Sequence, residues 1–326
     1  MELPAASDEE YIGSLGDSLT AGNGGCSSRE DPLAIAIQCR GRNFQSGGDF
    51  TLDEHITIAN ILKKFNPDLF GYSKAHLNAA LPGARAEDLL DQAHDLVKRI
   101  NEHPLEVDFK NKWKMIMIFI GGNDMCKYCK KPDSEAPEKF GNFIKAAVQY
   151  LKENLPKTIV VLTGMLDLSM LRKVDADQYF CEFLHFHECG CEMDDSFTDA
   201  MIKDACKQYG AREQAIQDSG VFDSTDDFTF VVQPFFEDLH DPPRNPNGTP
   251  NLDFFAADCF HFGNLGHAIV AKNLWNNMIE PVGKKTRTGD LTNYTSMGLT
   301  CPDASCPFIR TTKNSADCSK FMTPSA

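Results

Sequence analysis

Short apolar runs alternate with helical segments along most of this 326-residue chain. The clearest run, 114–120, is almost continuously apolar, which is typical of a strand that helices cover on both faces. Four further runs are expected to be strands: 11–15, 76–81, 158–162 and 228–233. Strands that alternate with helices predict an α/β fold built on a mostly parallel, doubly wound sheet of five strands.

The segments between these runs have the periodicity of amphipathic helices. In Glu87–Ile100 the apolar residues recur on one helix face. Helices are also expected in these segments: 32–38, 56–65, 137–154, 196–219 and 265–279. After Pro281 the periodicity stops. We therefore expect one domain over residues 1–286 and an irregular tail over 287–326 that packs on it.

The acidic composition limits the class of partner. The formal net charge is −15 at pH 7. Proteins that bind nucleic acid favour basic surfaces, and anionic lipids attract basic segments. No uninterrupted apolar stretch is long enough to span a bilayer. The composition therefore argues against nucleic acid as a partner and against electrostatic docking on anionic lipid.

Twelve cysteines are a high and even count, which is typical of disulfides in a secreted protein. Cys189 and Cys191 are too close to pair comfortably with each other, so each is expected to find a distant partner. The tail is expected to be held by its own cysteines, which are Cys301, Cys306 and Cys318. The sequence does not determine the connectivity, because even eight cysteines allow 105 pairings.

The insertion 181–195 also carries residue types that bind zinc. His185 and His187 precede Cys189 and Cys191, and the pair Cys126 and Cys129 could join them. Their spacing matches no established zinc pattern. We therefore predict disulfides at these cysteines and no metal site.

The predicted compartment is extracellular. Asn247 and Asn293 begin sequons for N-glycosylation. The chain opens at Met1 without the apolar core of a signal peptide. Three alternatives stay open: the leader has been removed, the chain is a segment of a longer precursor, or the protein is not secreted.

One stretch carries the signature of a nucleophile. The first predicted strand runs into Gly16-Asp17-Ser18-Leu19, where Gly16 permits a sharp turn. Ser18 would then lie at the carboxyl end of a strand, beside backbone N–H groups that can stabilise a negative oxygen. Taken alone, the tetrapeptide favours a surface turn with a capping serine. Asp17, and Asp124 after Asn123, are expected to be structural carboxylates that bond turn amides.

Three other blocks are expected at the same edge of the sheet. Gly83 and Asn123 each follow a predicted strand, and in α/β sheets the active crevice lies at the carboxyl ends of the strands. Asp258 precedes His261 by three positions, so its carboxylate can accept from Nδ1 and leave Nε2 free to take a proton from a serine. No aspartate precedes His267 by three positions, and this histidine is expected to lie on a face of the last helix.

Together the four blocks resemble the SGNH, or GDSL, hydrolase superfamily. The stretches Gly16–Gly24, Gly83–Leu89 and Phe119–Asp124 are similar to the animal phospholipase B group, as are Val231–Glu237 and Leu274–Gly283. The likeness covers nearly the whole chain. It implies a flavodoxin-like, three-layer fold. It also implies hydrolysis of phospholipid or lysophospholipid acyl esters with transient contact to a lipid surface, without a metal or other cofactor and without an obligate protein partner.

The resemblance also implies the role of each residue. Ser18 would be the nucleophile, His261 the general base and acid, and Asp258 the group that orients His261. The oxyanion would be met by the backbone N–H groups of Ser18 and Gly83 and by the side-chain amide of Asn123. An esterase for short acyl groups or acetylated carbohydrate, and an inactive binding domain, are the alternative functions.

Aromatic residues near the predicted mouth of the site have two interpretations. They could line a groove for an acyl chain, where each buried CH₂ contributes about 0.8 kcal/mol, or they could be ordinary core. The residues concerned are Phe180, Phe183, Leu184, Phe186, Phe235, Phe236, Phe254 and Phe255.

Overall fold

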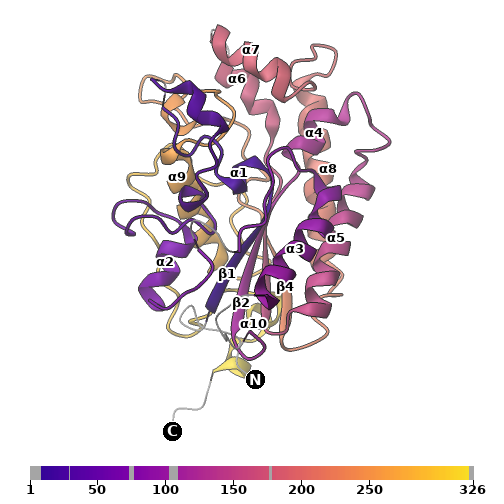
Figure 1. Cartoon of the computed structure of the whole chain (residues 1–326), viewed down its shortest axis with the longest axis vertical. Helices are drawn as coiled ribbons and strands as arrows, with labels where there is room; N and C mark the ends of the chain where they lie inside the picture. The colour runs from indigo at the N-terminus through magenta and orange to yellow at the C-terminus, as the bar shows by residue number, and fades with distance from the viewer. Residues whose placement is uncertain (1–8, 29, 73–76, 103–108, 176–177, 323–326) are drawn as a thin grey trace.

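The computed structural model describes residues 9–28, 30–72, 77–102, 109–175 and 178–322. Its centre is a sheet of four parallel strands that lie side by side in chain order (Figure 1). These strands are β1 (Glu9–Gly16), β2 (Trp113–Phe119), β3 (Thr158–Thr163) and β4 (Phe228–Gln233). Every residue of β3 and β4 is buried, as expected of strands that are covered on both faces.

The prediction of a fifth regular strand is wrong. The segment 77–81 does run parallel to β1, where the Ser14 N–H donates to the Leu77 carbonyl at 2.8 Å and the Ala79 N–H donates to the Ser14 carbonyl at 2.9 Å. Within the described part of this segment, however, Ser14–Asn78 is the only bridge, because the segment is rich in alanine, which disfavours strands, and meets Pro82 at once. His76, the first residue of the expected strand, lies outside the described residues.

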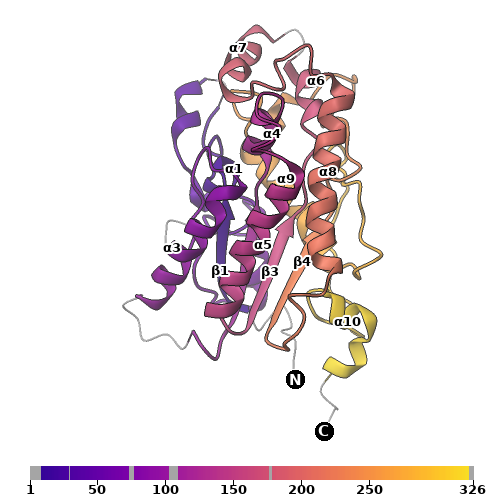
Figure 2. The ribbon, with the colours of Figure 1, turned by 90° about the vertical axis from the view of Figure 1, so that its right-hand side faces the viewer.

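Helices cover both faces of the sheet, which gives the predicted three layers (Figures 1 and 2). One face carries α3 (Leu89–Asn101), α5 (Pro137–Asn154) and α8 (Asp199–Asp218), and the other carries α2 (Ile58–Phe65) and α9 (Asn264–Met278). With the segment 77–81 beside β1, the order across the sheet is that of a flavodoxin-like fold.

Most helices follow the sequence pattern, and α5 has the predicted bounds. The segment 32–38 instead forms a 3₁₀ helix over Pro32–Ala36. The insertion 181–195 is partly helical, because α7 spans Tyr179–Glu188. Shorter α-helices are α1 (Ser18–Ala21), α4 (Gly122–Tyr128), α6 (Leu171–Asp175) and α10 (Thr312–Ala316). Further 3₁₀ turns span Arg40–Arg42, Ala86–Asp88, Leu168–Met170, Leu252–Phe254 and Cys318–Phe321.

Ten of the cysteines form five disulfides. They are Cys26–Cys39, Cys126–Cys189, Cys129–Cys191, Cys181–Cys259 and Cys306–Cys318. The distant partners expected for Cys189 and Cys191 are therefore confirmed, and these sulfurs are not available to a metal.

The expectation that Cys301 holds the tail is wrong. Cys301 is free and exposed, whereas the other free cysteine, Cys206, is buried. Hydrogen bonds to α9 hold this part of the tail instead. The Trp275 indole N–H donates to the Thr300 carbonyl at 2.8 Å, and the Arg310 N–H donates to the Met278 carbonyl at 2.9 Å. Within the described residues, no helix is long and apolar enough to cross a membrane.

Candidate active site

A tight turn at the end of β1 presents Ser18. Gly16 has a φ of 154°, and a Cβ there would lie 2.3 Å from the Phe119 carbonyl oxygen, so only glycine fits. The Asp17 carboxylate accepts from the Leu19 N–H at 2.9 Å and caps α1, which confirms its expected structural role. Ser18 is therefore held at the carboxyl end of β1, at the start of a helix.

Ser18, His261 and Asp258 form one chain of hydrogen bonds. The Ser18 Oγ atom lies 2.7 Å from His261 Nε2, and the Asp258 Oδ2 atom lies 2.6 Å from His261 Nδ1. The other carboxylate oxygen of Asp258 accepts from the N–H groups of Phe260 and His261, both at 3.0 Å. These four bonds fix the orientation of both the carboxylate and the imidazole.

The protonation of this pair follows from its surroundings. Burial by itself would lower the pKa of His261, but the Asp258 carboxylate outweighs it and holds that pKa above its ordinary value. Burial by itself would raise the pKa of Asp258, but His261 and the two backbone N–H donors hold it below its ordinary value. Asp258 is therefore ionised at neutral pH, and His261 can carry a proton between two partners.

The loop that carries this pair is held in an unusual conformation. Cys259, between Asp258 and His261, has a φ of 59°, which residues other than glycine rarely adopt. Its disulfide to Cys181 joins the loop to α7. The insertion that contains α7 therefore supports the candidate site directly.

Asn123 lies in the same pocket as Ser18, on α4 after β2. Its side-chain N–H₂ donates to the Ala84 carbonyl at 3.0 Å, which leaves one N–H free. The Asp124 carboxylate accepts from the Ala86 N–H at 3.1 Å, as its expected structural role requires. Gly83, at a φ of 77°, is exposed and is not among the described residues that line the pocket. It is joined to Asn123 only through its neighbour Ala84.

The pocket beside Ser18 is lined almost entirely by apolar side chains. Phe236, Phe254 and Phe255 line it, and like Phe235, which does not, they are buried members of the core, so the groove and core interpretations both hold for them. Further apolar lining comes from Leu19, Phe119, Met165, Leu166, Leu168, Met170, Leu171, Phe260, Phe262 and Leu291. Phe180, Phe183 and Phe186 do not line it but lie exposed on α7.

A second carboxyl group near His261 was not expected from the sequence. A carboxylate oxygen of Glu188, on α7, lies within 4.8 Å of an oxygen of Asp258 and a ring nitrogen of His261. Burial, and then the nearby Asp258 carboxylate, raise the pKa of Glu188 to about 7. The disulfide between Cys181 and Cys259 joins these segments, and the sequence does not give that pairing.

His267 is not an alternative base. It is fully buried on α9, where its Nδ1 atom accepts from the Phe44 N–H at 3.3 Å. Burial lowers its pKa to about 3, so the ring is neutral. Its place on the last helix agrees with the sequence, but its side chain faces the interior.

Comparisons with known proteins bear on the family of this chain. The chain is 39% identical over 322 residues to "Phospholipase B1, membrane-associated" of Homo sapiens and 37% identical to the protein of that name from Rattus norvegicus. Each match covers 94% of this chain but 22% of the relative, so the chain spans about a fifth of the length of these proteins.

The crystal structure of an extracellular lipase from Streptomyces rimosus matches 80% of this chain and 95% of its own, at 16% identity and a TM-score of 0.42. The sequence model for the GDSL-like lipases and acylhydrolases matches residues 12–274, from β1 into α9. Because this match covers most of the chain, including Ser18, Asn123, Asp258 and His261, the chain belongs to the GDSL-like lipase/acylhydrolase family.

Proposed function

We propose that this chain is a serine-dependent carboxylic ester hydrolase that releases fatty acids from phospholipids and lysophospholipids. The observation that carries the proposal is the hydrogen-bonded series Ser18–His261–Asp258 at an apolar pocket. The similarity over 94% of the chain to proteins named phospholipase B1 favours the same substrate class.

The proposed reaction begins when His261 Nε2 takes the proton of Ser18 as Oγ attacks the ester carbonyl carbon. The carbonyl oxygen becomes negative. The backbone N–H groups of Ser18 and Gly83 and the free N–H of Asn123 are the proposed donors to it. Asp258 stabilises the imidazolium and stays ionised throughout.

The tetrahedral intermediate collapses when His261 gives its proton to the leaving alcohol oxygen, which breaks the ester bond and leaves an acyl group on Ser18. A water molecule then attacks this acyl-enzyme while His261 takes one of its protons. The returned proton regenerates the Ser18 hydroxyl as the fatty acid leaves. The reaction therefore balances with the side chains of this protein, the ester and one water molecule.

The first experiment measures fatty-acid release from a lysophospholipid and a diacyl phospholipid. Wild type should release fatty acid, and Ser18→Ala should not, with the exposed Ser134→Ala as the control that keeps activity. Activity that falls steadily from acetyl to palmitoyl esters would replace the proposal with a short-chain esterase. Inactivity of folded wild type toward every ester would favour a binding domain.

We also propose that α7 touches the lipid surface from which substrate is drawn. Tyr179 is 87% exposed, and Phe183 and Phe186 are 63% and 68% exposed. Aromatic residues favour the interface between lipid and water. The disulfide Cys181–Cys259 joins the helix that carries these aromatic residues to the loop of His261.

The double variant Phe183→Ser/Phe186→Ser should bind phosphatidylcholine vesicles more weakly than wild type and lose activity on vesicles. Its activity on a water-soluble ester should be kept. Val221→Ser, an exposed apolar residue beyond α8, is the control. Equal vesicle binding by the double variant and wild type would refute a role for α7 in this contact.

We further propose that the protein works outside the cell, with residues 287–326 as a tail on a hydrolase domain of residues 1–286. Five disulfides support the compartment. Asn247 and Asn293 are both exposed and open to glycosylation. A mass shift on treatment with a glycosidase, lost in Asn247→Gln/Asn293→Gln, would test both sequons in protein secreted from an animal cell.

A further inference from the structure

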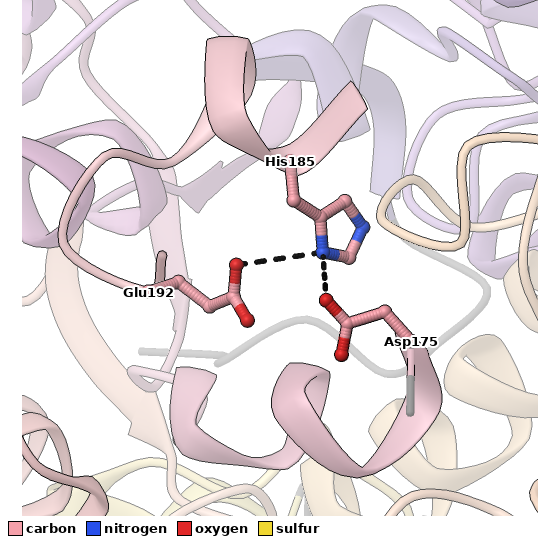
Figure 3. A group of neighbouring side chains, drawn as sticks. All are labelled: Asp175, His185 and Glu192. Carbon is pink, nitrogen blue, oxygen red and sulfur yellow. Dashed lines mark ion pairs between the residues drawn. The ribbon is translucent and has the colours of Figure 1, made fainter. Parts of the chain in front are cut away.

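A buried cluster of three ionisable side chains lies beneath α7 (Figure 3). His185 of α7 has its Nδ1 atom 3.1 Å from an oxygen of Asp175 and 3.5 Å from an oxygen of Glu192. Asp175 ends α6, and Glu192 follows the disulfide-bonded Cys191. His185 is 0% exposed, Asp175 is 8% exposed and Glu192 is 3% exposed.

Two of the facing atoms of this cluster have no hydrogen-bond partner among the described residues. Neither His185 Nδ1 nor Glu192 Oε2 has one, although the ring nitrogen is close to both carboxylates. Figure 3 shows the Nδ1 edge of the ring facing both carboxylate groups. Since buried polar atoms are almost always paired, a group that bonds to all three side chains at once would account for their arrangement.

We propose that the cluster binds a divalent metal ion, Zn²⁺, through His185 Nδ1 and one oxygen each of Asp175 and Glu192, with a water molecule as the fourth ligand. Zinc bonds to nitrogen and oxygen are about 2.0–2.2 Å long, so tetrahedral ligand atoms lie about 3.3–3.6 Å apart. The 3.5 Å distance in the cluster lies within that range, and the 3.1 Å distance is slightly shorter. A divalent ion also balances the charge of two buried carboxylates.

The far side of the imidazole has the partner that metal-bound histidines usually have. His185 Nε2 lies 2.9 Å from the backbone carbonyl oxygen of Asp258. With Nδ1 on the metal, Nε2 carries the hydrogen and donates it to this carbonyl, which fixes both the tautomer and the ring plane. The ion would therefore support the loop of Asp258 without touching the reacting atoms.

The donor set selects among metals. An imidazole nitrogen with two carboxylates suits zinc, whereas Ca²⁺ takes six to eight oxygen ligands. The cysteines of the insertion, which suggested zinc from the sequence, do not take part because they are disulfide-bonded. The alternative to a metal ion is a proton on His185 Nδ1 that is shared between the two carboxylates.

The test uses the full chain, purified, stripped with a chelator and titrated with Zn²⁺. We expect one ion per chain by elemental analysis and a rise in Tm on Zn²⁺ addition. Co²⁺ in its place should give the visible absorption of a tetrahedral site. Asp175→Asn/Glu192→Gln keeps the size of both side chains and should weaken Zn²⁺ binding by about 100-fold or more. His187→Gln, exposed on the same helix, is the matched control.

A stripped wild type that neither binds Zn²⁺ nor gains Tm from it would overturn the proposal and leave the proton as the occupant. Stoichiometric Zn²⁺ that persists in Asp175→Asn/Glu192→Gln would place the ion elsewhere, with the same consequence. If the double variant does not fold, the Co²⁺ spectrum of wild type decides. Absence of a tetrahedral spectrum would then count against the site.

Discussion

The Nε2 atom of His261 lies 2.7 Å from the Oγ atom of Ser18, although 243 positions separate these residues along the chain. The contact is made at the carboxyl edge of the sheet, where β1 delivers Ser18. The loop before α9 delivers His261, and its partner Asp258 is fully buried. The consequences of this relationship are open to direct measurement.

Asp258→Asn should lower kcat by about 10⁴-fold with little change in KM. An amide in this position presents its N–H₂ to His261 Nδ1, so the ring carries its hydrogen on Nε2 and cannot accept from Ser18. The measurement is steady-state kinetics on a water-soluble ester, with the exposed Asp241→Asn as the control. A loss below ten-fold would show that Asp258 does not set the tautomer.

Asn123→Ala should lower kcat by about 10²–10³-fold and leave KM nearly unchanged, because the lost donor acts mainly on the developing oxyanion. Its side chain also bonds the Ala84 carbonyl, so the Tm of the variant must be measured beside its kinetics. Asn142→Ala, on the exposed face of α5, is the control. An effect confined to KM would instead assign Asn123 to substrate binding.

The residues of the hydrogen-bonded series were predictable because each lies in a short motif next to a recognisable element. β2 and β3 read as apolar runs, since a strand covered on both faces has no polar side. Over the described residues 77–81 the expected regular strand does not form, because pairing along one edge competes with the local preferences of alanine and proline. Patterns of apolar residues do not resolve that competition.

Glu188 and His185 were not predictable as neighbours of the loop that carries Asp258 and His261. Both belong to the insertion, which a disulfide across 78 positions, Cys181–Cys259, and the contact of His185 with the Asp258 carbonyl join to that loop. No periodicity encodes a disulfide partner. For the same reason, the sequence did not show that Asp175 and Glu192 lie beside His185. The residues close to His185 along the chain suggested cysteine ligands instead.

Glu188→Gln should move the acid limb of the kcat/KM profile to lower pH. Above its pKa of about 7, the Glu188 carboxylate adds negative charge near His261 and helps to raise the pKa of the imidazole. Hydrolysis needs neutral His261, so activity falls as pH drops through that pKa. Removing the Glu188 charge lowers the pKa of His261, so the enzyme should stay active to lower pH.

The control is Glu182→Gln, an exposed residue of the same helix. Its profile should match that of wild type. An acid limb in Glu188→Gln that stays in place, or moves upward, would show that the Glu188 charge does not reach His261.

Glu213→Gln should stabilise the fold at pH 8.5 but not at pH 5. Glu213 is 1% exposed, with one oxygen accepting from the Met165 N–H at 2.9 Å and the other without a partner. Burial raises its pKa from 4.5 to about 8. Between these values the folded chain holds a proton that the unfolded chain has lost, so this group makes stability fall as pH rises.

Glutamine keeps an oxygen for the Met165 N–H and has no charge to bury. The stability of the variant therefore lacks the fall with rising pH that Glu213 causes in wild type. Asp17 and Asp124, whose pKa values burial raises to about 6 and 7, leave a smaller slope in the same direction. Urea midpoints at both pH values, with the exposed Glu153→Gln as reference, measure the difference. Parallel declines in Glu213→Gln and wild type would mean that Glu213 is already ionised in the folded chain at neutral pH, with water or a cation at its free oxygen.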